Sequence, residues 1–141
     1  MKNKDPDYGL YTFEIRSEVL IHSSYGQWNA ESTLNYHNLM IRYVDSICHQ
    51  PWGIIADLRQ WELCPPDCWE ILDETMKYCV QHGLCCHATL PNNRVIEVLV
   101  DRLKDRSPIP VPHQNFNNTS DALNWCSQLI KDAEHPKGDT I

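Results

Sequence analysis

The sequence predicts a single α/β domain: a mixed sheet of about five strands with about four helices. The chain has 141 residues, 42% of them hydrophobic and 22% charged, which suits one core. The most uninterrupted apolar run, residues 53–58 with a single break at Asp57, is typical of a strand that is buried on both faces, and we expect this central strand at residues 52–58. Segments of strand and helix periodicity alternate after an opening hairpin, which favours parallel strands joined by helical crossovers.

The N-terminal half of the chain predicts a hairpin followed by a helix. Apolar and polar residues alternate around Ser17 and Glu18, which indicates two antiparallel strands joined by a tight turn. Asn29 precedes an apolar stripe of helical spacing and can cap that helix, which Pro51 stops. The expected elements are strands at residues 11–16 and 19–25 and a helix from Asn29 to about His49.

The C-terminal half continues the alternation. Residues 59–64 are expected to leave the sheet, and Pro66 suits the first turn of the next helix, which Gly83 ends. Pro110 and Pro112 cannot donate hydrogen bonds, so the last strand can only lie at a sheet edge. The expected elements are a helix from Pro66 to Gly83, a strand at 84–90, a helix from Asn92 or Asn93 to before Pro108, an edge strand at 109–113 and a helix capped by Thr119 or Ser120.

The composition argues against several classes of function. A formal net charge of −7 and a pI near 5.4 disfavour binding to nucleic acid or to anionic lipid. The start has no apolar signal region, and no apolar run approaches the roughly 18 residues of a membrane span. We therefore expect a cytoplasmic protein with free thiols, a flexible leader at residues 1–9, a domain at 10–133 and a flexible tail at 134–141.

The segments PWGIIADLRQWEL and DALNWC, set in this order of elements, resemble small uncharacterised bacterial members of the SpoIIAA-like family. These proteins have the anti-sigma-factor-antagonist fold, also called STAS-like. The resemblance covers roughly residues 11–130. It implies a SpoIIAA-like mixed sheet whose first strand is antiparallel, and a regulator that binds a protein partner rather than an enzyme.

The best-known family members are switched by phosphorylation of a serine at the start of the helix after the central strand. Residues 58–73 of this chain contain no serine and no threonine, and Pro65, Pro66 and Asp67 stand in the corresponding region. The resemblance therefore implies a partner-binding module without the phospho-switch. Asp67 could mimic a phosphorylated residue, but an acidic residue in a first helical turn also favours the helix dipole.

A partner-binding site is predicted at the end of the central strand and in the loop and helix after it. The candidate residues are Arg59, Trp61, Glu62 and Asp67, because arginine and aromatic residues at a sheet rim are typical of interface hot spots. The partner would be another protein or a second copy of this chain. The simpler interpretation is that Asp57 and Arg59 form a local ion pair.

An alternative function is a carrier of a small apolar, lipid-like ligand or of a nucleotide. Trp28, Trp61 and Trp69 are its candidate ligand-binding residues, because they follow the second and third strands. A carrier would show an inward pocket of about 300 Å³ or more. The simpler interpretation is that these tryptophans close the ends of the core.

No catalytic motif supports an enzyme, and we expect no catalytic residue, no metal and no cofactor. Cys64 and Cys68 lack the spacing of disulfide oxidoreductases. Cys85 and Cys86 are adjacent on a strand, so their side chains point to opposite faces and cannot join one metal site. The remaining alternative, a thiol or metal enzyme, requires Cys64 and Cys68 to converge with a histidine, His82 or His87.

Overall fold

The computed structural model describes residues 10–92, 98, 101–102 and 111–134. Its sheet has the order β1-β2-β3-β4-β5, with β1 antiparallel to β2 and the other neighbours parallel. This confirms the predicted mixed sheet with an antiparallel first strand. The elements are β1 (Tyr11–Arg16), β2 (Val19–Gln27), α1 (Ala30–Ile47), β3 (Trp52–Leu63), the 3-10 helix η1 (Pro66–Cys68), α2 (Trp69–Gln81), β4 (Leu84–Pro91), β5 (His113–Asn115) and α4 (Thr119–Glu134).

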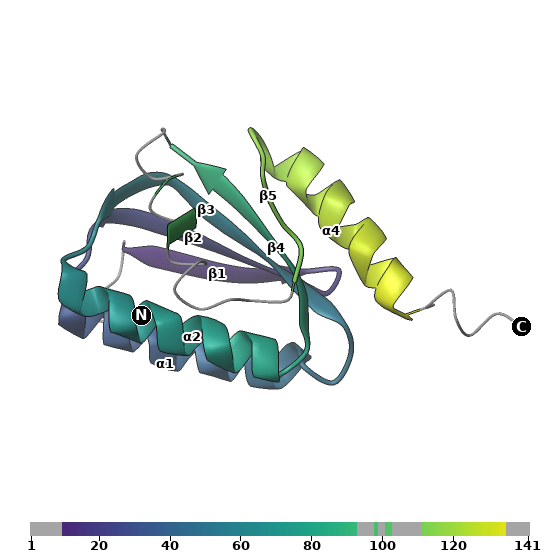
Figure 1. Ribbon diagram of the computed structural model, residues 1–141, viewed down its shortest axis with the longest axis horizontal. Coiled ribbons are helices and arrows are strands. Elements are labelled where there is room, and N and C mark those ends of the chain that lie inside the picture. Colours follow the sequence, from purple (N-terminus) through teal and green to yellow (C-terminus); the bar gives the residue numbers. More distant parts are fainter. Residues whose placement is uncertain (1–9, 93–97, 99–100, 103–110, 135–141) are drawn as a thin grey trace, which may run out of the picture.

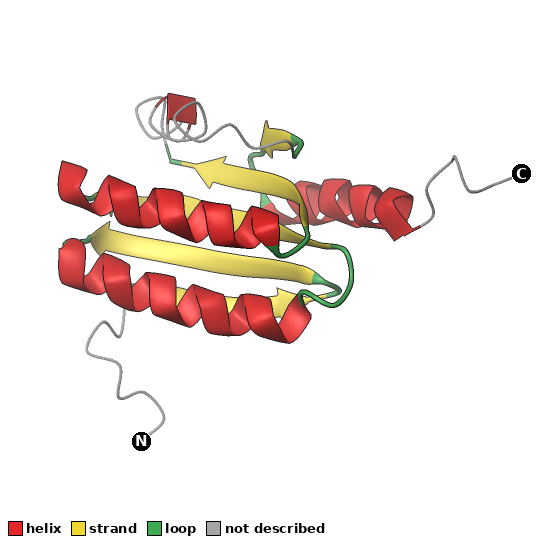
Figure 2. Ribbon diagram, turned by 60° about the horizontal axis from the view of Figure 1, so that its bottom comes forward, coloured by secondary structure: helices red, strands yellow, loops and turns green. Residues whose placement is uncertain are grey.

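Helices cover both faces of the sheet. Figures 1 and 2 show α1 and α2 side by side on one face and α4 on the other. Successive strand residues point to opposite faces, so Leu20 of β2 packs under α1 and α2 while Val19 and Ile21 pack under α4. The larger core, with Trp52 and Ile54 of β3, lies under α1 and α2.

Within the described residues there are three α-helices rather than about four. The predicted helix between Asn92 and Pro108 falls mostly outside them, although the described residues Val98, Asp101 and Arg102 are helical. The predicted leader, residues 1–9, and the predicted tail, residues 134–141, also lie outside, except for Glu134, which ends α4.

The hairpin turn and one of the two predicted N-terminal helix caps form as the sequence predicts. Ser17 and Glu18 have φ of 51° and 64°, the left-handed backbone of a two-residue hairpin turn. Asn29 caps α1 as predicted, since its Oδ1 accepts from the Ser32 backbone N–H at 2.8 Å. The predicted cap of the last helix, Thr119 or Ser120, is wrong, because it is Asn118 whose Oδ1 accepts from the Asp121 N–H at 2.8 Å.

The prediction that residues 59–64 leave the sheet is wrong for most of that segment, because β3 continues to Leu63. Ser23 of β2 pairs with Asp57, but Tyr25 pairs with Gln60, so β3 carries one extra residue there. Such a bulge shifts the alternation of side chains between the two faces of a sheet. Trp61 consequently lies in the same core as Leu58, although the two are three residues apart.

The last strand also differs from the prediction of an edge strand at 109–113. β5 does lie at the edge of the sheet, but it consists of His113–Asn115. Val111 and Pro112 are described and lie outside the strand, and residues 109–110 are not among the described residues. Pro112 has no N–H, but its carbonyl oxygen accepts from the His87 N–H at 3.0 Å, so it precedes the strand and guides the pairing with β4.

Candidate functional site

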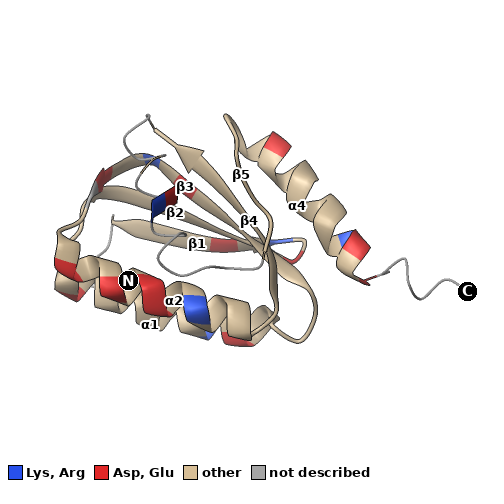
Figure 3. Cartoon of the chain, in the orientation of Figure 1, with Lys and Arg blue, Asp and Glu red and all other residues tan. Residues whose placement is uncertain are grey.

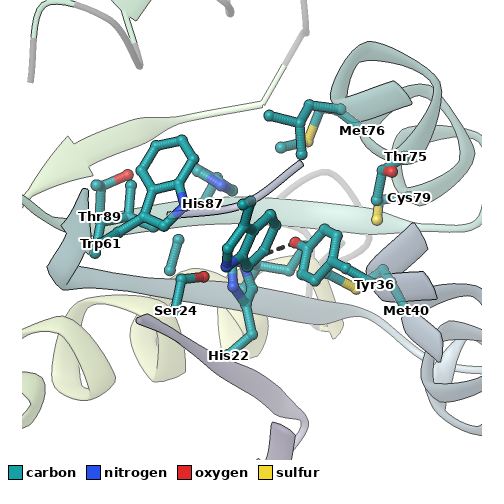
Figure 4. A pocket seen from close by; sticks show the side chains of 15 residues that line it. His22, Ser24, Tyr36, Met40, Trp61, Thr75, Met76, Cys79, His87 and Thr89 are labelled. Carbon is teal, nitrogen blue, oxygen red and sulfur yellow. Dashed lines mark hydrogen bonds between the residues drawn. The ribbon is translucent and has the colours of Figure 1, made fainter. Parts of the chain in front are cut away.

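A cavity of about 90 Å³ lies between the sheet and the helix pair α1 and α2. Its sheet side includes Ser24 of β2 and Trp61 of β3, and its helix side includes Met40 of α1 and Cys79 of α2. Figure 4 shows these side chains on opposite sides of the space. The lining is mainly apolar, with a few polar side chains from β2, β4 and the helices.

Aromatic side chains build one wall of the cavity. Trp28 and Trp61 meet edge to face with ring centroids 5.8 Å apart, and Trp28 lies 4.8 Å from the Tyr36 ring. The Trp28 indole N–H donates to the Leu10 carbonyl oxygen at 3.1 Å, which fixes the ring in place. This wall is therefore held by aromatic packing together with one partly buried hydrogen bond.

Two polar side chains of the cavity, His22 and Tyr36, are uncharged at pH 7. Burial lowers the pKa of His22 from 6.5 to about 4, although the carboxylate of Asp57 raises it, so the imidazole is neutral at pH 7. Its Nε2 lies 3.3 Å from the Tyr36 hydroxyl, shown as a dashed line in Figure 4. Burial also raises the pKa of Tyr36, so its hydroxyl keeps its proton.

Three buried polar atoms on side chains that line this cavity have no hydrogen-bond partner within the described part of the chain. They are His22 Nδ1, Ser24 Oγ and Trp61 Nε1. Leaving a buried polar atom unpaired costs about 1–3 kcal/mol, so such atoms are rare in native proteins. Sequence reasoning did not assign His22 or Ser24 to a site. The sequence nevertheless marks them as unusual, because both residues occupy core-facing positions of β2, where apolar residues are expected.

The four candidate partner-binding residues do not form one patch. Arg59, Glu62 and Asp67 are exposed, whereas Trp61 is 8% exposed and lies in the cavity wall. The local ion pair is present: Arg59 Nε and Nη2 donate to the two carboxylate oxygens of Asp57 at 3.0 and 2.9 Å. Burial raises the pKa of Asp57, but the hydrogen bonds from Arg59 outweigh this and bring it below its usual value.

The three candidate ligand-binding tryptophans are also divided. Trp28 and Trp61 line the cavity, whereas Trp69, at the start of α2, does not. A lipid chain or a nucleotide needs a pocket of about 300 Å³ or more. At about 90 Å³ the cavity is too small for a lipid chain or a nucleotide, so its volume does not support a carrier of either ligand.

The cysteines are free thiols, as expected. Burial, followed by the neighbouring Cys68, raises the pKa of Cys64 to about 12, so this thiol is a poor nucleophile at neutral pH. The His82 ring stacks on Tyr78, and its Nδ1 lies 2.8 Å from the Tyr78 carbonyl oxygen. In the described ranges no three His, Cys, Asp or Glu side chains gather as a metal site would require.

Solved structures have a fold similar to that of this chain. One is an uncharacterized protein of the DUF3478 family with a SpoIIAA-like fold from Shewanella loihica PV-4, with a TM-score of 0.63 at 15% identity over 82% of this chain and 91% of that chain. The chain has a SpoIIAA-like fold. The structural match establishes the fold of the domain, but a sequence identity this low does not establish its activity.

Two further structures similar to this SpoIIAA-like domain are anti-sigma factor antagonists. The unphosphorylated form of SpoIIAA matches with a TM-score of 0.60 at 7% identity, over 84% of this chain and 97% of that chain. A protein from Mycobacterium paratuberculosis matches with a TM-score of 0.58 at 16% identity, over 87% and 97%. No family model and no curated protein matches the chain. Among the described helices none is both long and apolar enough to cross a membrane.

Proposed function

We propose that this SpoIIAA-like domain is a non-enzymatic regulatory module that binds a protein partner through the end of β3, η1 and the start of α2. The observation that carries the proposal is the fold, because two similar solved structures are anti-sigma factor antagonists. The proposed binding surface contains the three exposed residues Arg59, Glu62 and Asp67. The buried Trp61 is not part of it.

The charge of this surface favours a basic partner. Arg59 is paired with Asp57, whereas Glu62, Asp67 and the nearby Glu70 are exposed in consecutive elements. The whole chain has a formal net charge of −7. Figure 3 shows more acidic than basic positions along the neighbouring helices α1 and α2. Complementary charge speeds association and selects partners. A second copy of the chain would bring like charges together, so a different protein is favoured over a homodimer.

The proposed surface needs no serine phosphorylation. Residues 48–74 contain no serine and no threonine, and η1, which follows β3, consists of Pro66–Cys68. Asp67 is exposed within η1 and supplies a negative charge that no kinase or phosphatase controls. We therefore propose partner binding without the phospho-switch.

The pKa values of His22 and Cys64 support binding rather than catalysis. A general acid or base works best when its pKa lies near the operating pH. His22, which lines the cavity together with His87, has a pKa of about 4 and is neutral at pH 7. The half-buried Cys64 has a pKa of about 12 and keeps its proton at pH 7.

Affinity capture from a lysate of the host organism tests the proposal. The tagged wild type is compared with Glu62→Lys/Asp67→Lys, and with Asp132→Lys/Glu134→Lys, which makes the same charge change on exposed positions of α4. A protein retained by the wild type and by the α4 variant, but lost from the β3–η1 variant and released by salt, supports the proposal. Equal retention by all three proteins, or no retained protein, contradicts it.

A further inference from the structure

We infer that the cavity between the sheet and the α1/α2 layer is a binding site for a small, neutral, planar molecule that carries a hydrogen-bond acceptor, such as an azole or a small amide. This site is separate from the exposed surface proposed for the protein partner. The inference does not depend on that surface, and each can fail without the other.

Polar atoms without a hydrogen-bond partner gather in one part of the fold. His22, Ser24 and Trp61 are 6%, 2% and 8% exposed, and each has one polar atom without a partner among the described residues. All three side chains line the same cavity. By contrast, the indole N–H groups of Trp28 and Trp52, outside this set, donate to carbonyl oxygens at 3.1 and 2.8 Å.

The donor and acceptor properties of these atoms define the polar part of the ligand. The Trp61 indole N–H can only donate, so the ligand must offer an acceptor there. The Ser24 hydroxyl can donate or accept. His22 Nδ1 donates when the Tyr36 hydroxyl donates to Nε2 and accepts in the other tautomer, so it adapts to the second polar group of the ligand.

The size and walls of the cavity define the rest of the ligand. A cavity of about 150 Å³ holds benzene, so about 90 Å³ suits a five-membered ring or a smaller molecule. The rings of Trp28, Tyr36 and Trp61 favour a flat ligand. No Asp, Glu, Lys or Arg of the described chain lies in the lining, so an ionised ligand would lose its hydration without gaining an opposite carboxylate, ammonium or guanidinium charge.

Water is the competing occupant. At a share of about 30 Å³ each, roughly three water molecules would fill the same space and could satisfy the same three atoms. Water and a planar ligand differ in two ways that can be measured. A ligand saturates at a defined concentration, and it displaces bound water from the Trp61 indole.

Pyrazole is a suitable probe, because it is a flat, neutral five-membered ring with one N–H donor and one nitrogen acceptor. Thiophene has a similar shape without these groups and serves as the control ligand. The five tryptophan indole N–H signals of the ¹⁵N-labelled protein are followed by NMR, and Trp61→Phe identifies the Trp61 signal. We expect pyrazole to shift the Trp61 signal to saturation while the Trp52 signal, outside the cavity, stays in place.

Two substitutions test the geometry of the site. Ser24→Ala should weaken pyrazole binding about fivefold, the effect of one neutral hydrogen bond, whereas Ser127→Ala on α4 should leave it unchanged. Ala56→Val fills the cavity and should abolish binding, and the unchanged Trp52 signal shows that the variant is folded. The inference is overturned if the Trp61 signal never moves, if thiophene binds as tightly as pyrazole, or if bound water stays at the Trp61 indole when pyrazole is saturating.

Discussion

Lowering the pH from 7 to 5 is expected to destabilise the fold through His22. The imidazole is 6% exposed, and burial lowers its pKa from 6.5 to about 4 despite the opposing effect of Asp57. Between these pH values the unfolded chain binds a proton that the folded protein does not bind. The unfolded state is therefore favoured as the pH falls through this window.

The size of the effect follows from the pKa difference. One pH unit of differential protonation is worth about 1.4 kcal/mol, so the full effect of lowering the His22 pKa to about 4 is about 3 kcal/mol. Between pH 7 and pH 5 about 2 kcal/mol of stability should be lost. Asp57, whose pKa is also lowered, loses its own contribution only at more acidic pH, as it becomes protonated.

Urea unfolding at pH 5, 6, 7 and 8 measures this loss, with tryptophan fluorescence as the readout. His22→Gln keeps a neutral polar group near Tyr36, and His49→Gln changes an exposed histidine as a control. Wild type and His49→Gln should lose about 2 kcal/mol more than His22→Gln between pH 7 and pH 5. Parallel curves for wild type and His22→Gln would refute the reasoning.

Three further substitutions have defined effects on the free energy of unfolding, each measured by urea titration at pH 7. Ser17→Asn/Glu18→Gly should stabilise the protein by about 1 kcal/mol, because the present residues hold positive φ; a loss of stability would contradict the turn. Asn29→Ala should cost about 1 kcal/mol through loss of the α1 cap, and no change would show that the cap is not formed. Ser24→Ala should stabilise by about 1 kcal/mol, because an unpaired buried hydroxyl is removed; destabilisation would show that Ser24 has a partner.

Most of the element order could be predicted because it depends on local patterns. The alternation in β1 and β2, the apolar run of β3 and the apolar stripes of the helices are visible in short windows of sequence. The bulge opposite Ser23 and Tyr25 could not be predicted, since it depends on the pairing of β2 with β3. That bulge turns Trp61 into the core and explains why a residue expected on a rim lies in a cavity wall.

The candidate site was harder to predict than the fold. Trp28 and Trp61 were singled out because tryptophan is conspicuous, and both line the cavity. His22 and Ser24 are ordinary residues of a strand, and their importance comes from the lack of hydrogen-bond partners after folding. Which polar atoms remain unpaired depends on packing between β2, β3 and α1, and no sequence window contains all three.

Native mass spectrometry of the protein purified from its host, at low salt and without chelator, tests the proposed role most directly. The monomer has a mass of 16.4 kDa. A regulatory module should appear as a complex with one protein partner, and this complex should be absent from the Glu62→Lys/Asp67→Lys variant and present in the α4 control. The bare 16.4 kDa monomer alone, or the same complex in both variants, would contradict partner binding through the end of β3 and η1.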